Sequence, residues 1–301
     1  VGFTADDVSF SMSSVTDQAG TGNEETYTAL DVSIADAGLV GFPDLLLYVT
    51  SGALQLNQTS RTDGQRIDWA TATNGTNNPD DLLASLQVAD SVDIAAQGTL
   101  VMDAFGVLIA KGSFSVQLGS AIELGADELP GGGDDTEYQA MTLQLGSSAF
   151  TGASPVEVFV GVGGELKDNN DDNGEIDGSY SDDTVDTTNA LGFYASLEDL
   201  TLVTLKDDGG TANDTADDKS YLGLDVEDVS AELVGIDILT LKAWDVDLKV
   251  NQVSDGDTNP DNDPPKLDWT GLSFANAAWL SGSLPDVDAT VDIAAVGSVE
   301  V

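Results

Sequence analysis

The chain contains no cysteine and no histidine among its 301 residues, and only nine residues are lysine or arginine. Without cysteine there is no disulfide framework and no thiolate metal site. Without histidine there is no imidazole metal ligand, no Ser-His-Asp triad and no residue of the commonest general-base type. No P-loop or dinucleotide-binding glycine pattern is found either. We therefore expect a protein that is not an enzyme.

Positive charge is scarce, whereas Asp and Glu number 54, and the formal net charge is -45. Nine cations cannot build a surface that binds a phosphate backbone, so nucleic acid is excluded as a partner. Such a charge makes the folded state repel itself unless salt or divalent cations relieve the repulsion. A calcium-containing medium outside the cell is the environment that this composition favours. No apolar run reaches the roughly 18 residues of a membrane span, so none is expected here.

What the chain does contain is an internal repeat. The segment 39–58, LVGFPDLLLYVTSGALQLNQ, matches 233–252, LVGIDILTLKAWDVDLKVNQ, in length and at both ends. Further matches keep the same order along the chain: Tyr27 with Tyr221, Leu30 with Leu224, Asp68-Trp69 with Asp268-Trp269, and Val92 with Val291. A fixed order with variable loops between the matches is typical of repeat proteins. The repeat divides the chain into a first unit, residues 1–190, and an incomplete second unit, residues 191–301. We expect the parent protein to carry further copies.

Both units indicate an all-β fold. Runs such as 45–58 and 91–119 alternate apolar with small or polar residues and are separated by Gly, Asp, Asn and Pro. Short helices are expected only at 80–85 and 274–280. Long runs joined by tight glycine bends favour an elongated repeat structure of stacked strands resembling a β-solenoid. Tandem β-sandwich modules are the alternative.

The acidic loop 167–186 is the first candidate metal site. Asn169, Asp171 and Asn173 occupy positions one, three and five of an EF-hand-like loop, and Asp177 occupies position nine. Tyr180 stands at position twelve, where that motif has a bidentate Glu, so a Ca²⁺ site of looser design is the hypothesis. A solvated acidic loop is the alternative.

A second acidic loop lies at 254–268. Its candidate Ca²⁺ ligands are four carboxylates within nine residues: Asp255, Asp257, Asp261 and Asp263. The first unit has no such cluster at the corresponding place, so this site is optional for the fold.

The recurring Trp69 and Trp269 admit two interpretations. An exposed Trp beside an acid is a platform for stacking a sugar, whereas a buried one packs in the core, and the second reading is favoured. For the recurring Asn57 and Asn251, satisfying a turn or forming an in-register ladder is favoured over binding.

The sequence resembles the tandem repeats of very large bacterial surface or secreted proteins, which are adhesin-like, β-rich and Asp-rich. The resemblance rests on PVEVFVGVGG (155–164), ALGFYASLEDLTLVTLKDD (190–208), the segment 220–252, and VDIAAVGSVEV (291–301). It covers nearly the whole chain but implies no activity. It implies a cell-surface or extracellular stalk, fibre or adhesin spacer whose partners are neighbouring repeats or subunits of the same protein.

Two other functions remain open. One is an adhesin module that binds glycan or another cell through exposed Trp, Asn and Asp. The other is a polysaccharide-active enzyme on a β-helix, with carboxylates converging in a groove.

Overall fold

The computed structural model describes residues 1–17, 24–42, 44–72, 86–125, 134–167, 183–209, 217–255 and 264–301. The all-β prediction is confirmed, because strands dominate the described residues and the helices are single turns. The strands of the first unit are β1 (Gly2–Asp17), β2 (Glu25–Val40), β3 (Leu45–Thr59), β4 (Val92–Ala104), β5 (Leu108–Glu123), β6 (Thr136–Gly146), β7 (Val156–Val162), β8 (Glu165–Lys167) and β9 (Thr184–Asp186). Those of the second are β10 (Leu191–Asp207), β11 (Lys219–Val234), β12 (Lys242–Asp255) and β13 (Ile293–Glu300).

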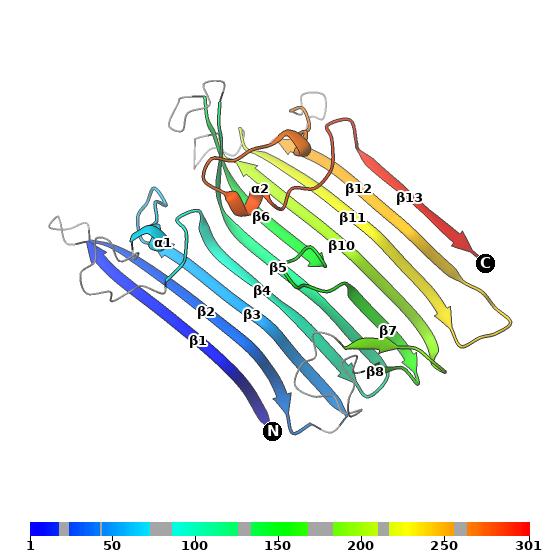
Figure 1. Cartoon of the computed structure of the whole chain (residues 1–301). Coiled ribbons are helices and arrows are strands. Elements are labelled where there is room, and N and C mark those ends of the chain that lie inside the picture. The colour runs from blue at the N-terminus through cyan, green and yellow to red at the C-terminus, as the bar shows by residue number, and fades with distance from the viewer. Residues whose placement is uncertain are drawn as a thin grey trace.

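Eleven of these strands form one large open sheet (Figure 1). The order is β1-β2-β3-β4-β5-β6-β10-β11-β12-β13, and β7 pairs with both β5 and β10. Every pair is antiparallel, and each strand mostly neighbours the one before it in the chain. The strands β8 and β9 form a separate two-stranded sheet.

The solenoid-like stacking expected from the sequence is not what the described residues form. A solenoid carries the chain round in one direction, so that successive coils pair in parallel. Here the chain reverses at each hairpin, for example at Gly41 (φ 87°) and Gly235 (φ 83°). The left-handed conformation at these glycines turns the strand back beside its predecessor, giving antiparallel neighbours. Tandem sandwiches are not seen either, because the described strands include only one large sheet.

The sequence repeat is visible as equivalent strand pairs. Gly2 faces Val40 in the β1–β2 pair, and Gly192 faces Val234 in the β10–β11 pair. A bulge also recurs: the β3–β4 register shifts around Ser51 (φ 53°), and the β12–β13 register shifts around Asp245 (φ 51°). The unit boundary after residue 190 itself stays a prediction, since the sheet continues through it.

The two units join where β10, the first strand of the second unit, pairs with two strands of the first unit. Strand β10 pairs along Leu191–Leu197 with β7, and along Asp199–Lys206 with β6. Its other edge pairs with β11 along nearly its full length. The second unit is therefore hydrogen-bonded to the first as one more set of strands in the same sheet.

Short segments cover one face of the sheet. They are α1 (Trp69–Ala72), a 3-10 turn at Trp269–Gly271, α2 (Ala278–Ser281), and the β8–β9 pair. Three buried clusters lie beneath them, centred on Trp69, on Trp269 and on Phe159. We call this side the covered face. No helix among the described residues is long and apolar enough to cross a membrane.

The helices match the sequence expectations only in part. The helix predicted at 274–280 overlaps α2 (Ala278–Ser281) at residues 278–280, whereas Phe274 forms an isolated β-bridge with Glu123. The helix α1 (Trp69–Ala72) was not predicted from the sequence. The other expected helix, at 80–85, lies outside the described residues.

Candidate interaction surfaces

Most predicted calcium ligands lie outside the described residues. This holds for all four of the loop 167–186 and for three of the second loop: Asn169, Asp171, Asn173, Asp177, Asp257, Asp261 and Asp263. Asp255 is described, at the end of β12, where it faces Lys219 on β11. Within the described ranges, no three Asp or Glu side chains gather closely enough to hold a metal ion. The calcium hypothesis therefore stays a prediction.

The first recurring Trp closes a buried joint between a loop and the sheet. The Trp69 indole N–H donates to Asn57 Oδ1 on β3 at 3.1 Å. Asn57 Nδ2 donates to the carbonyl oxygens of Ile67 and Ala89, at 2.9 and 2.8 Å. Asn57 thus ties three points of the loop between β3 and β4 to the sheet.

The second unit repeats this joint atom for atom. The Trp269 indole N–H donates to Asn251 Oδ1 at 3.1 Å. Asn251 Nδ2 donates to the carbonyl oxygens of Leu267 and Asp288, at 2.9 and 3.0 Å. Beneath it, a Cβ on Gly223 would lie 2.5 Å from the Trp269 ring, so only glycine allows this approach.

Burial decides between the two interpretations of the tryptophans. Trp69 is 2% exposed and Trp269 is 0% exposed, so neither offers a face to a sugar. The prediction that they pack in the core is confirmed. The asparagines satisfy loop carbonyls and do not form a ladder. The sequence repeat singles out all four residues. It does not show that each Trp is hydrogen-bonded to an Asn, because the loops between Asn and Trp differ in length.

A second polar side chain in each unit also hydrogen-bonds the loop that the asparagine contacts. In the first unit Gln55 Nε2 donates to the carbonyl oxygen of Gln87 at 3.4 Å. At the equivalent place, Lys249 Nζ donates to the carbonyl oxygen of Asp286 at 2.7 Å and also contacts Asp225 Oδ2 at 3.2 Å. These contacts bind the loops to the sheet.

The outer strands β1 and β13 are open edges of the described sheet. By the repeat, β1 is equivalent to β10, which is paired on both sides. Likewise β13 is equivalent to β4, which pairs with β5 as well as β3. Each outer strand is thus paired along one edge only, whereas its counterpart in the other unit is paired along both edges.

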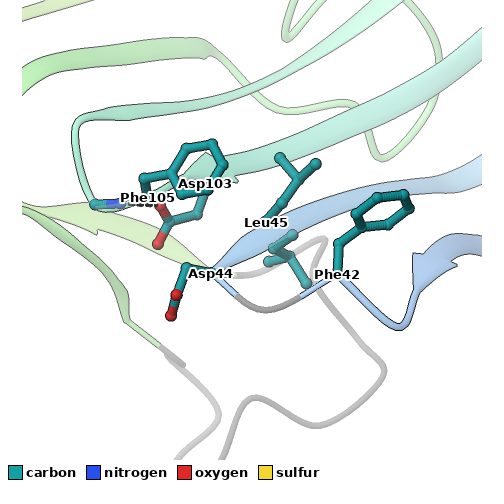
Figure 2. A pocket seen from close by; sticks show the side chains of 7 residues that line it. Phe42, Asp44, Leu45, Asp103 and Phe105 are labelled. Atoms are coloured by element: carbon teal, nitrogen blue, oxygen red, sulfur yellow. Dashed lines mark hydrogen bonds between the residues drawn. The ribbon is translucent and has the colours of Figure 1, made fainter. Parts of the chain in front are cut away.

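A shallow acidic hollow of about 440 Å³ lies where the β2–β3 and β4–β5 turns meet. Figure 2 shows Phe42 and Phe105 on opposite sides of it, with the carboxylates of Asp44 and Asp103 nearby. Phe105 has a φ of 61°, held by its N–H donating to the Asp44 carbonyl oxygen at 2.7 Å. The second unit has Ile236 and Ile238 at the places of Phe42 and Asp44, so the repeat does not preserve the hollow.

A second hollow, of about 540 Å³, is lined by Lys111, Glu157 and Tyr194 among others. The Tyr194 hydroxyl donates to Glu157 at 2.5 Å. Burial, together with this carboxylate, raises the pKa of Tyr194 above its ordinary value. A phenol held protonated in this way is neither a base nor a nucleophile at neutral pH.

Two carboxylates oppose each other near the β1 edge. Asp6 faces Asp36 across the β1–β2 pair, and Asp7 is next to Asp6. Burial raises the pKa of Asp36, and the charges of Asp6 and Asp7 raise it further. At the equivalent position of the second unit, Ser196 and Ser230 share a hydrogen bond of 2.7 Å.

Comparison of the chain with protein-family models, with curated proteins and with solved structures found no match.

Replacing either of the asparagines that hold these loops, Asn57 or Asn251, is expected to destabilise the fold. In Asn57→Asp or Asn251→Asp, the side chain keeps an acceptor for the indole N–H but loses both donations to loop carbonyls. Buried carbonyls left without donors cost about 2–3 kcal/mol in the free energy of unfolding. Chemical denaturation measures this loss. The exposed neighbour Gln58→Glu, which adds the same charge, is the matched control and should change stability by less than about 0.5 kcal/mol. Equal effects at positions 57 and 58 would contradict the role of the joint.

The Asp36 environment predicts a pH dependence with a definite sign. Because the folded pKa is raised, the ionised carboxylate is penalised only in the folded state, and the penalty is complete above that pKa. Stability should therefore rise as the pH falls through the folded pKa towards the unfolded value of about 3.9. Asp36→Ser, which copies the second unit, should stabilise the chain at pH 7 by roughly 0.5 kcal/mol and flatten this rise.

Thermal melts of both chains from pH 7 to pH 4 provide the measurement. Glu24→Gln removes one negative charge from an exposed site and controls for the change in net charge. An Asp36→Ser chain no more stable than Glu24→Gln at pH 7 would refute the cross-strand repulsion.

Proposed function

We propose that this chain is a structural repeat segment of a large extracellular bacterial surface or filament protein, where it serves as a stalk, fibre or adhesin spacer. The continuous sheet carries the proposal: β10 opens the second unit and is hydrogen-bonded on one edge to its own unit and on the other to the preceding one. A further unit at either end could pair with the outer strand there, β1 or β13, in the same way.

The mechanism is mechanical. Each unit contacts only its neighbours, so stability accumulates along the array, as in other repeat proteins. Backbone hydrogen bonds between neighbouring strands connect the units, and these bonds require no particular side chain at the surface. Surface residues can therefore drift between copies, as Ile236 and Phe42 do, while the array continues.

The acidic composition and the resemblance to bacterial surface repeats support the extracellular part of the proposal. A net charge of -45 keeps long arrays soluble, and the salt of an external medium screens the repulsion within each unit.

Duplicating one unit tests the array directly. In a chain with residues 1–190 present twice before residues 191–301, six strand positions are added to the sheet. At about 4.8 Å each, the particle should lengthen by about 29 Å. Small-angle scattering from monomer separated by size exclusion measures the largest dimension.

A chain of matched mass, with a flexible Gly-Ser linker between the two copies of 1–190, serves as the control. It should give a broad distribution of dimensions, because its units are not hydrogen-bonded to each other. The array proposal fails if the directly joined chain gives the same broad distribution.

The calcium hypothesis has its own test. If the acidic loops bind Ca²⁺ with the millimolar or submillimolar affinity of extracellular modules, about 5 mM calcium should stabilise the chain by roughly 1–2 kcal/mol per site. Melting in calcium is compared with melting in chelator and in magnesium at equal ionic strength. Asp171→Asn and Asp261→Asn assign the effect to a loop. Identical melting in calcium, magnesium and chelator rules out the calcium sites.

A further inference from the structure

The face of the sheet opposite the covered face carries an unbroken apolar row. We call it the open face. In-register neighbours place one residue of each of ten strands in a single line across the sheet. The ten residues are Phe10, Val32, Leu54, Ala96, Val116, Leu143, Leu202, Leu224, Val250 and Ile293.

Two parallel rows widen this line into a band. The first consists of Met12, Leu30, Leu56, Ile94, Leu118, Met141, Thr204, Leu222 and Gln252. The second consists of Gly98, Phe114, Leu145, Leu200, Val226, Leu248 and Ala295. The three rows contain no charged residue, although the chain as a whole is strongly acidic.

Among the described residues the band is largely uncovered, because only Gly98 and Val226 of its members are buried. Along β5, Ser113 on the covered face is buried while Phe114 and Val116 are not, and along β6 Thr142 and Gln144 are buried while Leu143 is not. All three buried clusters lie on the covered face. At the middle of the band Leu118 is still 36% exposed, and at its ends Phe10 and Ile293 are 64% and 67% exposed.

The polarity of the two faces is the reverse of an ordinary half-covered sheet, which turns its apolar side chains to the core. The covered face is comparatively polar: its neighbouring row runs Ser11, Asp31, Gln55, Ala95, Gln117, Thr142, Val203, Gly223 and Asn251. A contiguous apolar patch larger than a few hundred Å² marks an interaction site. The apolar band is therefore the surface on which we expect a partner.

The size of the band fits a stable interface. Ten strands at about 4.8 Å spacing span about 43 Å, and three rows at about 7 Å span about 20 Å. Each copy would bury roughly 900 Å², or roughly 1,800 Å² in total. That lies within the standard range for specific protein–protein interfaces.

The charge distribution selects the occupant. A basic partner gains nothing from a band without carboxylates, and elsewhere two copies of this chain repel each other. The uncharged band is the surface where two copies can meet without opposing their carboxylates. Twisted sheets pack face to face at about 10 Å with their strands inclined by about 30°.

We propose that the open face binds the open face of a second copy of this chain, forming a two-layered dimer in which both copies use the same residues. An interface of this kind is closed by its two-fold symmetry, so association stops at two chains. The inference concerns the face of the sheet and does not depend on the array proposed above, which concerns its edges.

Sedimentation equilibrium of the whole chain tests the dimer. We expect a monomer–dimer equilibrium that is strengthened by salt, since salt screens the repulsion between acidic surfaces. Val116→Glu, at the centre of the band, should weaken dimerisation at least 100-fold. Ser33→Glu adds the same charge to an exposed site on the covered face and should change the dissociation constant less than about threefold, apart from the small added repulsion.

A substitution that keeps the fold guards against misfolding of Val116→Glu. Because the chain has no cysteine, Val116→Cys and Ser33→Cys each give a single thiol. Cys at position 116 should react with a maleimide more slowly as the protein concentration rises, and its rate should recover on dilution. Cys at position 33 should react at one rate throughout.

Three results would overturn the proposal. A monomer at all concentrations with position 116 freely reactive would mean that the band has no protein partner of this kind; co-flotation with neutral lipid vesicles would then identify a lipid surface as the occupant. A monomer with position 116 protected at every dilution would mean that the chain covers its own band. An open ladder of oligomers unaffected by Val116→Glu would mean that copies join through the β1 and β13 edges.

Discussion

The antiparallel hydrogen-bond ladder is the constraint on which the rest of the structure depends. It passes from the first unit into the second through β10 without a break, so the two units are one sheet and not two bodies. Because the ladder is made by the backbone, it tolerates drift in side chains. It also leaves edges that can be extended, since β1 and β13 each correspond to a strand that is paired on both sides.

Side chains add specificity only where a loop must be held. In each unit one asparagine on the sheet accepts from a buried indole and donates to two carbonyl oxygens of the loop above it. This joint is repeated although the loops have drifted in length, which shows where the repeat is constrained. Around it the covered face remains fairly polar, and the uncharged apolar band lies on the other side. The edges and the band therefore offer two independent surfaces for association, one along the array and one across it.

Several elements could be predicted from the sequence. The strands, the repeat, and the packing of Trp69 and Trp269 follow from alternation and self-similarity, which are local properties. The arrangement of the strands could not be predicted in the same way. Long runs joined by glycine bends suit a solenoid as well as hairpins, and the deciding feature is the direction in which Gly41 and Gly235 turn the chain. Likewise the sequence shows that Asn57 recurs, but it does not show that Asn57 is hydrogen-bonded to Trp69, because a loop of variable length separates the two residues.

The sequence by itself determined the all-β class, the repeated unit and the acidic, cysteine-free surface, because composition and periodicity act residue by residue. Only the tertiary structure decided that the strands share one antiparallel sheet, which strands are left at its edges, and which face the loops cover. The physical reason is that alternation states which side chains share a face, as Leu54 and Leu56 do, but not what lies against that face. Covering depends on where distant loops return, and for the apolar band no described loop returns to it.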